Sequence, residues 1–221
     1  KRLALDYYYA PASTPSRGPM MTARALGIEL NLKSVDLVKQ EQLKPEFLAL
    51  NHQHTLPTLV DGSFVLWESK AIIGYLVSKY GKDDDALYPR EPCKRALVDR
   101  LLYFDMSLHQ HFRDWAFPAM KQGLPPCPEA LVKFQTYLGH LDTHLRLQGT
   151  RFVTSDTICV ADQTLACATT TYRELGVSMI SHPHIVSWLQ RCEADMPGYA
   201  DICLEGANIM AQCFKEILTV K

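Results

Sequence analysis

Apolar and polar positions in the first eighty residues switch repeatedly between a two-residue period and a helical period. Short runs of apolar, β-branched or aromatic residues predict four strands, at residues 3–9, 29–36, 58–60 and 64–67. Helical patterns begin near Pro15 and after Ser69, and a short helix is expected around residues 45–48. Asp61-Gly62 separates the last two strands and favours a tight hairpin turn. The first part of the chain is therefore expected to be an α/β unit with a mixed four-strand sheet.

The pattern beyond this unit is wholly helical. A polar stretch at residues 81–92 contains the run Asp83-Asp84-Asp85 and is typical of a linker. Short breaks with Gly, Pro, Ser or Asp then separate five helical segments, at residues 94–122, 128–148, 160–175, 183–196 and 200–218. The order of strands and helices in the first unit is thioredoxin-like. We therefore expect a thioredoxin-like domain at 1–80, a linker at 81–92 and an all-α helical bundle domain at 93–221.

Charge and hydropathy exclude two classes of partner. Lys and Arg (23) almost balance Asp and Glu (24), so the formal net charge is −1 and indicates no nucleic-acid partner. No apolar run approaches the ~20 residues that a membrane span needs. The first residues also lack the long apolar core of a secretory signal. We expect neither a nucleic acid nor a membrane as a partner.

Cysteines and histidines indicate a reduced, metal-free protein. The seven cysteines are scattered without a C-x-x-C pair, which is typical of reduced thiols in a cytoplasmic protein. Among the eight histidines, His109 and His111 stand two apart and His140 and His144 four apart, but no third ligand has suitable spacing. The sequence therefore predicts a cytoplasmic location and no metal.

Residues 51–70 combine features that favour a peptide-like ligand. Leu56-Pro57 stands directly before the third strand, where a residue that cannot donate to a sheet ladder is tolerated. Although only a minority of X–Pro bonds are cis, we expect a cis bond here, because it turns the Leu56 backbone outward so that its N–H and C=O can pair with a ligand. At the other end, Glu68-Ser69-Lys70 opens a helix, whose unpaired N–H groups favour a carboxylate.

These motifs resemble the glutathione site of a known enzyme family. The run N-H-Q-H-T-L-P-T-L-V-D, followed by L-W-E-S-K-A-I, is similar to that of the cytosolic glutathione transferases, above all the insect delta and epsilon classes. The resemblance extends over essentially the whole chain. It implies glutathione as a co-substrate, a small hydrophobic electrophile as the second substrate, and a homodimer of two-domain subunits.

Two functions of different kinds follow from this resemblance. The first is a detoxification-type transferase that joins the glutathione thiolate to electrophiles, with peroxide reduction and dehydrochlorination as side activities. The second is a non-enzymatic protein that binds glutathione and hydrophobic ligands. A glutaredoxin-like enzyme is disfavoured because no cysteine lies near the start of the first helix.

The resemblance implies a catalytic role for Ser13, which matches the family's serine in the S-x-P-S-R run. A thiol titrates near ~8.5, so lowering its pKa by about two units takes roughly 2.7 kcal/mol of preferential anion stabilisation. A hydroxyl that donates to sulfur at a helix N-terminus is a source of that stabilisation. Alternatively, Ser13 or Thr14 is only a helix cap. Tyr8 is the rival donor, while Tyr7 and Tyr9 are expected to pack beneath the first helix.

The resemblance also implies how glutathione's glutamyl end binds. Glu68 is expected to pair with the ammonium group, and Ser69 with its backbone N–H to hold the α-carboxylate. Lys70 stands where the insect classes often carry arginine. Because lysine cannot make the planar bidentate contact, its contribution is expected to be smaller.

The cysteinyl and glycyl parts of glutathione are assigned in the same way. The cysteinyl backbone would pair with Leu56, before Pro57, like an added strand. His54 is expected near the glycyl carboxylate, although a packed loop histidine is the alternative. Gln42 takes a place often held by a second histidine.

The electrophile is expected to rest on the helix at residues 94–122. Apolar residues at helical spacing would form the wall of the pocket, together with a residue at the start of the first helix: Pro15, Phe104, Leu108, His111, Phe112 and Trp115. Alternatively, this stripe is only the core face of the bundle. The segment is one residue short of the family pattern near Ser107. His111 and Arg113 are unusual polar groups for such a wall and would select a polar or anionic substrate.

Two further features concern folding and assembly. Cys159 stands where the family has a Ser or Thr of a capping box that includes Asp162, so we expect a cap weaker by roughly 0.5–1 kcal/mol. The helix after Ser69 has apolar residues on more than one side, and one of these sides is expected to face a partner subunit.

Overall fold

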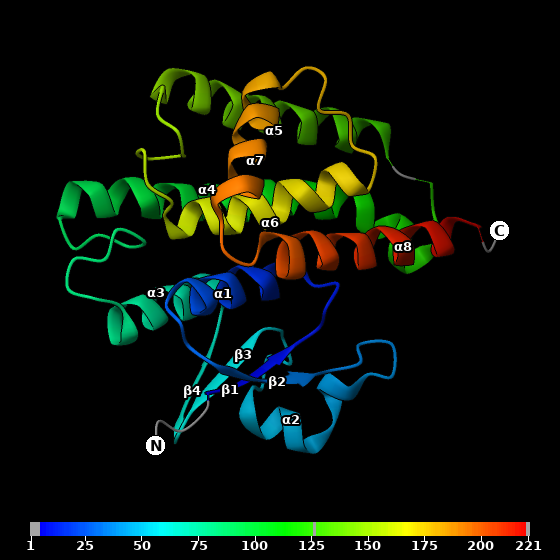
Figure 1. Ribbon diagram of the computed structural model, residues 1–221. Helices are drawn as coiled ribbons and strands as arrows, with labels where there is room; N and C mark the ends of the chain where they lie inside the picture. The colour runs from blue at the N-terminus through cyan, green and yellow to red at the C-terminus, as the bar shows by residue number, and fades with distance from the viewer. Residues whose placement is uncertain (1–4, 126, 220–221) are drawn as a thin grey trace.

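The computed structural model describes residues 5–125 and 127–219. Figure 1 shows a strand-containing part below and a helical part above, with α1 (Thr14–Ala25) and α3 (Ser69–Tyr80) between the sheet and the upper helices. The expected α/β domain followed by an all-α domain is thus confirmed. Leu3 and Ala4, which the sequence assigned to the first strand, lie outside the described residues.

The sheet has the expected mixed topology. Its strands lie in the order β2-β1-β3-β4 and are β1 (Leu5–Tyr9), β2 (Leu30–Ser34), β3 (Thr58–Asp61) and β4 (Phe64–Trp67). β1 is parallel to β2 and antiparallel to β3, which forms the hairpin with β4. Gly62 adopts a φ of 63° in the hairpin turn, a conformation that glycine reaches without a steric penalty.

The two faces of the sheet carry different helices. α1 and α3 cover one face, and α2 (Pro45–Leu50) lies on the opposite side, after a 3₁₀ turn at Glu41–Leu43 (Figure 1). The buried core beneath α1 and α3 consists of Leu5, Tyr7, Ala23, Leu59, Ile72 and Leu76. Because strand side chains alternate, Tyr8 points the other way and meets Phe47 of α2, with 5.7 Å between ring centroids.

The helical part surrounds one central helix. It comprises α4 (Pro92–Gln122), α5 (Pro128–Gln148), α6 (Val160–Glu174), α7 (Pro183–Asp195) and α8 (Glu205–Thr219). Every α6 residue from Val160 to Tyr172 is buried, and α6 packs against α1, α4 and α8. Across residues 5–125 and 127–219, no helix is long and apolar enough to cross a membrane.

The last predicted helix needs a correction. Residues 200–218 do not form one α-helix, because a π-helical segment at Tyr199–Leu204 precedes α8. The wider i→i+5 hydrogen-bond spacing of a π-helix leaves no mark in the apolar pattern, so the sequence did not reveal it.

α3 is buried on two sides by this chain alone. Ile72 and Leu76 belong to the core of the sheet, whereas Ile73 and Val77 belong to the core of the helical part. The sequence argument that an apolar face of this helix requires a partner subunit was therefore wrong.

The N-terminus of α6 has the predicted capping box. The backbone N–H of Cys159 donates to Asp162 Oδ2 at 2.9 Å, and the Cys159 side chain faces the N–H three residues on. Asp162 Oδ1 also accepts from Val153 N and Trp188 Nε1, both at 2.9 Å. This carboxyl group therefore ties α6 to α7 and to the preceding loop.

Arg17 joins α1 to the helical part. Its side chain is buried, and its guanidinium donates to the Cys203 carbonyl (2.6 Å), Thr171 Oγ1 (2.6 Å) and Thr14 Oγ1 (3.0 Å). Gly206 permits this close approach, because a Cβ there would lie 2.4 Å from Arg17 Cδ. The start of α1 is thus held by residues far along the chain.

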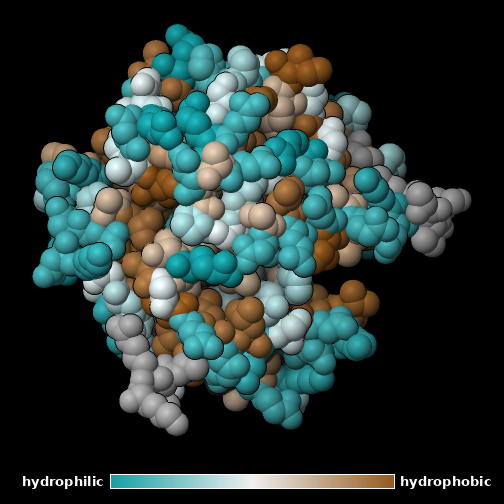
Figure 2. Space-filling view, viewed as in Figure 1, coloured by the Kyte–Doolittle hydropathy of each residue, from teal (hydrophilic) through white to brown (hydrophobic). Residues whose placement is uncertain are grey.

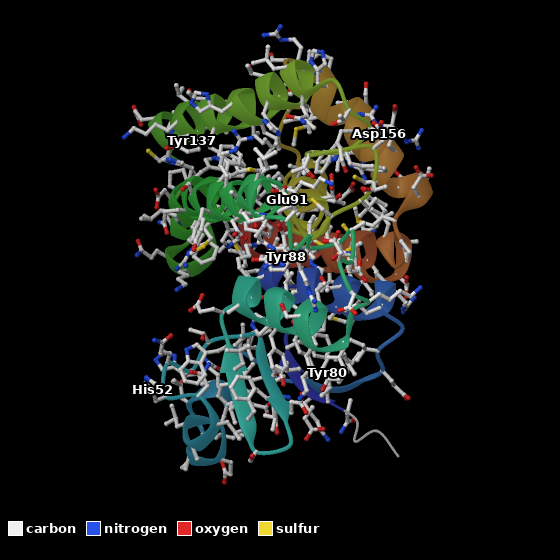
Figure 3. All side chains as sticks on the ribbon, turned by 90° about the vertical axis from the view of Figure 1, so that its left-hand side faces the viewer. His52, Tyr80, Tyr88, Glu91, Tyr137 and Asp156 are labelled. Carbon is white, nitrogen blue, oxygen red and sulfur yellow. The ribbon has the colours of Figure 1, made fainter. Side chains whose placement is uncertain are left out.

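The segment between α3 and α4 is anchored by Tyr88. Its hydroxyl donates to Asp99 of α4 at 2.6 Å, and the Arg95 guanidinium lies 3.4 Å from its ring centroid. A Cβ at Gly74 of α3 would approach the same ring to 3.2 Å. In Figure 3, Tyr88 and Glu91 lie at heights between His52 of the sheet-containing part and Tyr137 of the helical part.

Candidate active site

A cavity of about 300 Å³ lies where the two parts of the molecule meet. α1 contributes Thr14, Pro15 and Gly18 to its wall, and α6 contributes Thr164 and Ala168. The other walls come from the segment before β3, the first turn of α3 and one face of α4. Residues from both halves of the chain therefore form one site.

The segment before β3 presents a cis proline to the cavity. The Leu56–Pro57 bond is cis, as the sequence predicted, and Thr55, Leu56 and Pro57 line the wall. Buried Asn51 holds this segment, donating from Nδ2 to the Thr55 carbonyl at 3.1 Å. Within the described residues, the backbone N–H and C=O of Leu56 form no hydrogen bond, so both can pair with a ligand.

The first turn of α3 lies beside it in the cavity wall. Glu68 is the N-cap residue with a φ of 69°, a conformation that is unfavourable for a residue with a side chain. Its side chain makes no capping hydrogen bond. Glu68, Ser69 and Lys70 all line the cavity, so a carboxyl group, a hydroxyl and the N-terminal N–H groups of a helix meet there.

Lys70 forms an ion pair that the sequence did not reveal. Its ammonium contacts Asp105 Oδ2 of α4, and the exposed fractions of the two side chains are 21% and 5%. Asp105 Oδ1 is buried without a hydrogen-bond partner in the described protein. A single carboxylate in the apolar run L-L-Y-F-D-M was the available signal, because buried carboxylates are generally paired.

Ser13 and Thr14 occupy different environments at the start of α1. Ser13 is the N-cap residue, and its side chain makes no capping hydrogen bond. Thr14 does not act as the cap, because it is the first helical residue and its buried hydroxyl accepts from Arg17. Ser13 directly precedes Thr14 and Pro15, which line the cavity, but is not itself part of the wall.

The three tyrosines of β1 all have packing roles. Tyr7 is fully buried and donates to the Ser16 carbonyl at 2.6 Å, and burial raises its pKa well above the usual value. Tyr9 stacks on Tyr7 with 6.3 Å between ring centroids. Tyr8, the rival thiolate donor, lies on the α2 face of the sheet and not in the cavity wall.

His54 and Gln42 lie outside the cavity wall. His54 is exposed, with a φ of 47°, two residues before the lining residue Leu56. Gln42 is half-buried in the 3₁₀ turn before α2. Their assignment to the glycyl end of glutathione stays a prediction.

The predicted electrophile wall on α4 has to be corrected. Leu108, Phe112 and Trp115 are buried in the core of the helical part, while Phe104 and His111 pack on Tyr137. Of the six predicted wall residues, Pro15 alone lines the cavity. The apolar stripe is thus the core face of the bundle, which was the alternative interpretation.

The α4 face that does line the cavity is mostly polar. It consists of Asp105, Met106, His109, Gln110 and Arg113. Burial lowers the pKa of His109 to about 4 despite the nearby Asp105 carboxylate, so this imidazole is neutral near pH 7. Among the described residues, no group of three or more His, Cys, Asp or Glu side chains is placed to hold a metal ion.

A second hollow of about 500 Å³ lies between β1, β2, α1 and the start of α8. Its wall mixes apolar residues, among them Ile28, Leu30 and Leu32, with charged ones such as Arg24 and Glu205. Figure 2 shows hydrophobic residues on this face where the strands lie below the helical part. None of the predicted glutathione contacts lines this hollow, so the first cavity is the candidate site.

Comparison with known proteins identifies the class. The family described as "Glutathione S-transferase, N-terminal domain" matches residues 3–78, and "Glutathione S-transferase, C-terminal domain" matches residues 125–196. The chain therefore belongs to the glutathione S-transferase family.

Three solved structures that resemble this chain come from insects. A delta-class glutathione transferase of Nilaparvata lugens is 40% identical, with 96% of this chain and 99% of that chain covered and a TM-score of 0.92. An epsilon-class enzyme from the housefly, Musca domestica, is 30% identical over 96% and 98% of the two chains, with a TM-score of 0.89. A Drosophila mojavensis homologue solved with bound glutathione is 30% identical over 96% and 97%, with a TM-score of 0.87.

Proposed function

We propose that this protein conjugates the thiolate of glutathione to electrophilic compounds, acting as a detoxification-type transferase in the cytoplasm. The observation that carries the proposal is the single cavity that combines the outward backbone of Leu56, the Glu68–Ser69 turn and the N-terminus of α1. The Leu56 backbone suits a peptide backbone, and the Glu68–Ser69 turn suits the charged end group of an amino acid. The N-terminus of α1 suits a developing anion.

In this proposal, charge complementarity orients glutathione in the cavity. The Glu68 carboxylate binds the γ-glutamyl ammonium, and Ser69 with the first N–H groups of α3 binds the α-carboxylate. Leu56 pairs with the cysteinyl backbone, and the glycyl end extends toward His54 and Gln42. Lys70 contributes less than a free cation would, because Asp105 already neutralises it.

This pose brings the sulfur to the start of α1. There the Ser13 hydroxyl donates to the thiolate, and the positive end of the helix dipole adds to its stabilisation. The Ser13 side chain is not used as a cap, which supports this role. Together the two effects are required to supply the roughly 2.7 kcal/mol that corresponds to a pKa lowered by about two units.

A direct assay separates the transferase from the binding protein. With glutathione and an aryl halide such as 1-chloro-2,4-dinitrobenzene, the transferase releases chloride and forms the thioether in proportion to enzyme. A protein that binds glutathione in calorimetry, but forms no thioether above the uncatalysed rate, is a carrier. That result would overturn the proposed activity.

A further inference from the structure

We propose that the electrophile end of the cavity accepts substrates with an anionic group, and that Arg113 binds this group. The inference rests on the proposed transferase function, because it concerns the second substrate of the same site. Every other charged side chain in the cavity wall has a partner of opposite charge, in the protein or in glutathione, whereas Arg113 has none among the described residues.

Four charged side chains line the cavity: Glu68, Lys70, Asp105 and Arg113. Lys70 and Asp105 neutralise each other. Glu68 is assigned to the ammonium group of glutathione. Arg113 is therefore the cation that neither the protein nor the glutamyl end of glutathione neutralises.

The surroundings of Arg113 leave its charge available. Within residues 5–125 and 127–219 it forms no ion pair, and its guanidinium carbon lies 4.8 Å from the centroid of the Phe117 ring. The nearest carboxylate in sequence, Asp114, accepts a hydrogen bond from Gln110 at 2.7 Å. Arginine has a fixed positive charge and a planar set of donors, so a ligand carboxylate, sulfonate or phosphonate suits it.

The position of Arg113 separates it from the glutamyl subsite. At ~1.5 Å per residue, it lies about 12 Å along α4 from Asp105, which is tied to Lys70 at the start of α3. Met106 and Ala168 line the same cavity and offer apolar surface. The site thus fits an amphipathic electrophile, with an apolar body on these two residues and an anionic head at Arg113.

A matched pair of substrates isolates this head group. Ethacrynic acid and its methyl ester share one α,β-unsaturated ketone and differ in the carboxylate. In the reaction the glutathione sulfur bonds to the β-carbon, the electrons of the C=C bond move toward the carbonyl, and the α-carbon takes up a proton. The addition is therefore balanced without an oxidant or a leaving group.

The measured quantity is the ratio of kcat/KM for the acid to kcat/KM for the ester. We expect Arg113→Gln to lower this ratio at least ten-fold, and Arg113→Lys to keep it within about three-fold because the charge is retained. Lys121→Gln is the matched control: Lys121 lies on the same helix, 5.4 Å from the centroid of the same Phe117 ring, outside the cavity wall. In Lys121→Gln the acid-to-ester ratio should change less than two-fold.

Two results would overturn the inference. One is an unchanged acid-to-ester ratio in Arg113→Gln. The other is an effect of Arg113→Gln confined to the KM for glutathione, which would assign Arg113 to the glycyl carboxylate.

The proposed transferase function can fail separately. If the wild type binds glutathione but conjugates neither compound, calorimetric titration of acid and ester into the glutathione-loaded protein still decides the role of Arg113. A loss of affinity of ten-fold or more for the acid alone in Arg113→Gln supports the inference. Equal affinities in wild type and variant overturn it.

Discussion

The hydroxyl groups of Ser13 and Thr14 are adjacent in sequence but have different partners. Thr14 accepts from Arg17 and donates weakly to Thr171 at 3.4 Å, so its hydroxyl is committed to the interior. Ser13 makes no capping hydrogen bond at the N-terminus of α1. A single position therefore combines a donor with the positive end of a helix.

We expect Ser13→Ala to lower kcat/KM at least ten-fold and to raise the pKa of bound glutathione. The reason is the loss of the hydrogen bond that favours the thiolate. A pH titration of thiolate absorbance, together with the conjugation rate, measures both effects. Tyr8→Phe is the control and should keep the wild-type rate, because Tyr8 packs on Phe47 away from the cavity. Full activity in Ser13→Ala with loss in Tyr8→Phe would reverse the assignment.

The Lys70–Asp105 pair predicts an effect on stability. Lys70→Met leaves the Asp105 carboxylate buried without its cation, and breaking a buried pair in this way costs about 3 kcal/mol. Urea denaturation of the two proteins measures the difference in the free energy of unfolding.

The control for this prediction is a surface ion pair. Lys39→Met removes the pair with Asp36, whose side chains are 77% and 38% exposed, and should change stability by less than about 0.5 kcal/mol. If the two variants lose the same free energy of unfolding, burial of Asp105 does not determine the loss of stability.

At the scale of helices and strands, the local pattern predicted most of the fold. The hairpin and the sheet were readable because turn chemistry and a two-residue period act over short distances. The cis bond at Leu56 was expected only from the place of Pro57 directly before a strand. The interior face of α4 was not assigned correctly. Its apolar stripe suited either a ligand wall or a bundle core, and only the packing of α5 and α6 against α4 resolves this.

Site residues could be predicted from the sequence where neighbouring residues of one segment bind the same part of the ligand. Glu68 and Ser69 share one helix start, and both line the cavity. The pairing of Lys70 with Asp105 depends on contacts 35 residues apart, which spacing along the chain does not reveal. Arg113 was noticed as an unusual cation, but its free charge became clear only from its neighbours.

The N-terminus of α6 yields a prediction about an element. Cys159→Ser replaces a weak sulfur acceptor with a hydroxyl in the capping box, so we expect the free energy of unfolding to rise by roughly 0.5–1 kcal/mol. Urea denaturation tests this. Cys213→Ser, at an exposed position of α8, is the control and should be neutral. No gain in Cys159→Ser would mean that the thiol already satisfies the N–H group.

For the whole molecule, we propose a homodimer, as is typical of the family. The buried apolar residues of α3 are covered internally and call for no partner, but exposed apolar side chains are available elsewhere, at Phe64, Leu97 and Tyr103. A stable interface needs more than ~1,200 Å² in total. Sedimentation at micromolar concentration should give twice the chain mass of 25.0 kDa. A species of the single-chain mass would contradict the proposal.

The buried guanidinium of Arg17 limits how this protein can be recombined with its relatives. A chimaera that takes residues 1–80 from this chain brings a buried positive charge to the junction. The donated helical half must then offer a carbonyl where Cys203 stands and a hydroxyl where Thr171 stands, with no side chain at position 206. Halves that lack these groups would join at the linker and still misplace the start of α1. Shuffled libraries should therefore retain Arg17 together with Thr171 and Gly206, even though more than 150 residues separate Arg17 from Thr171.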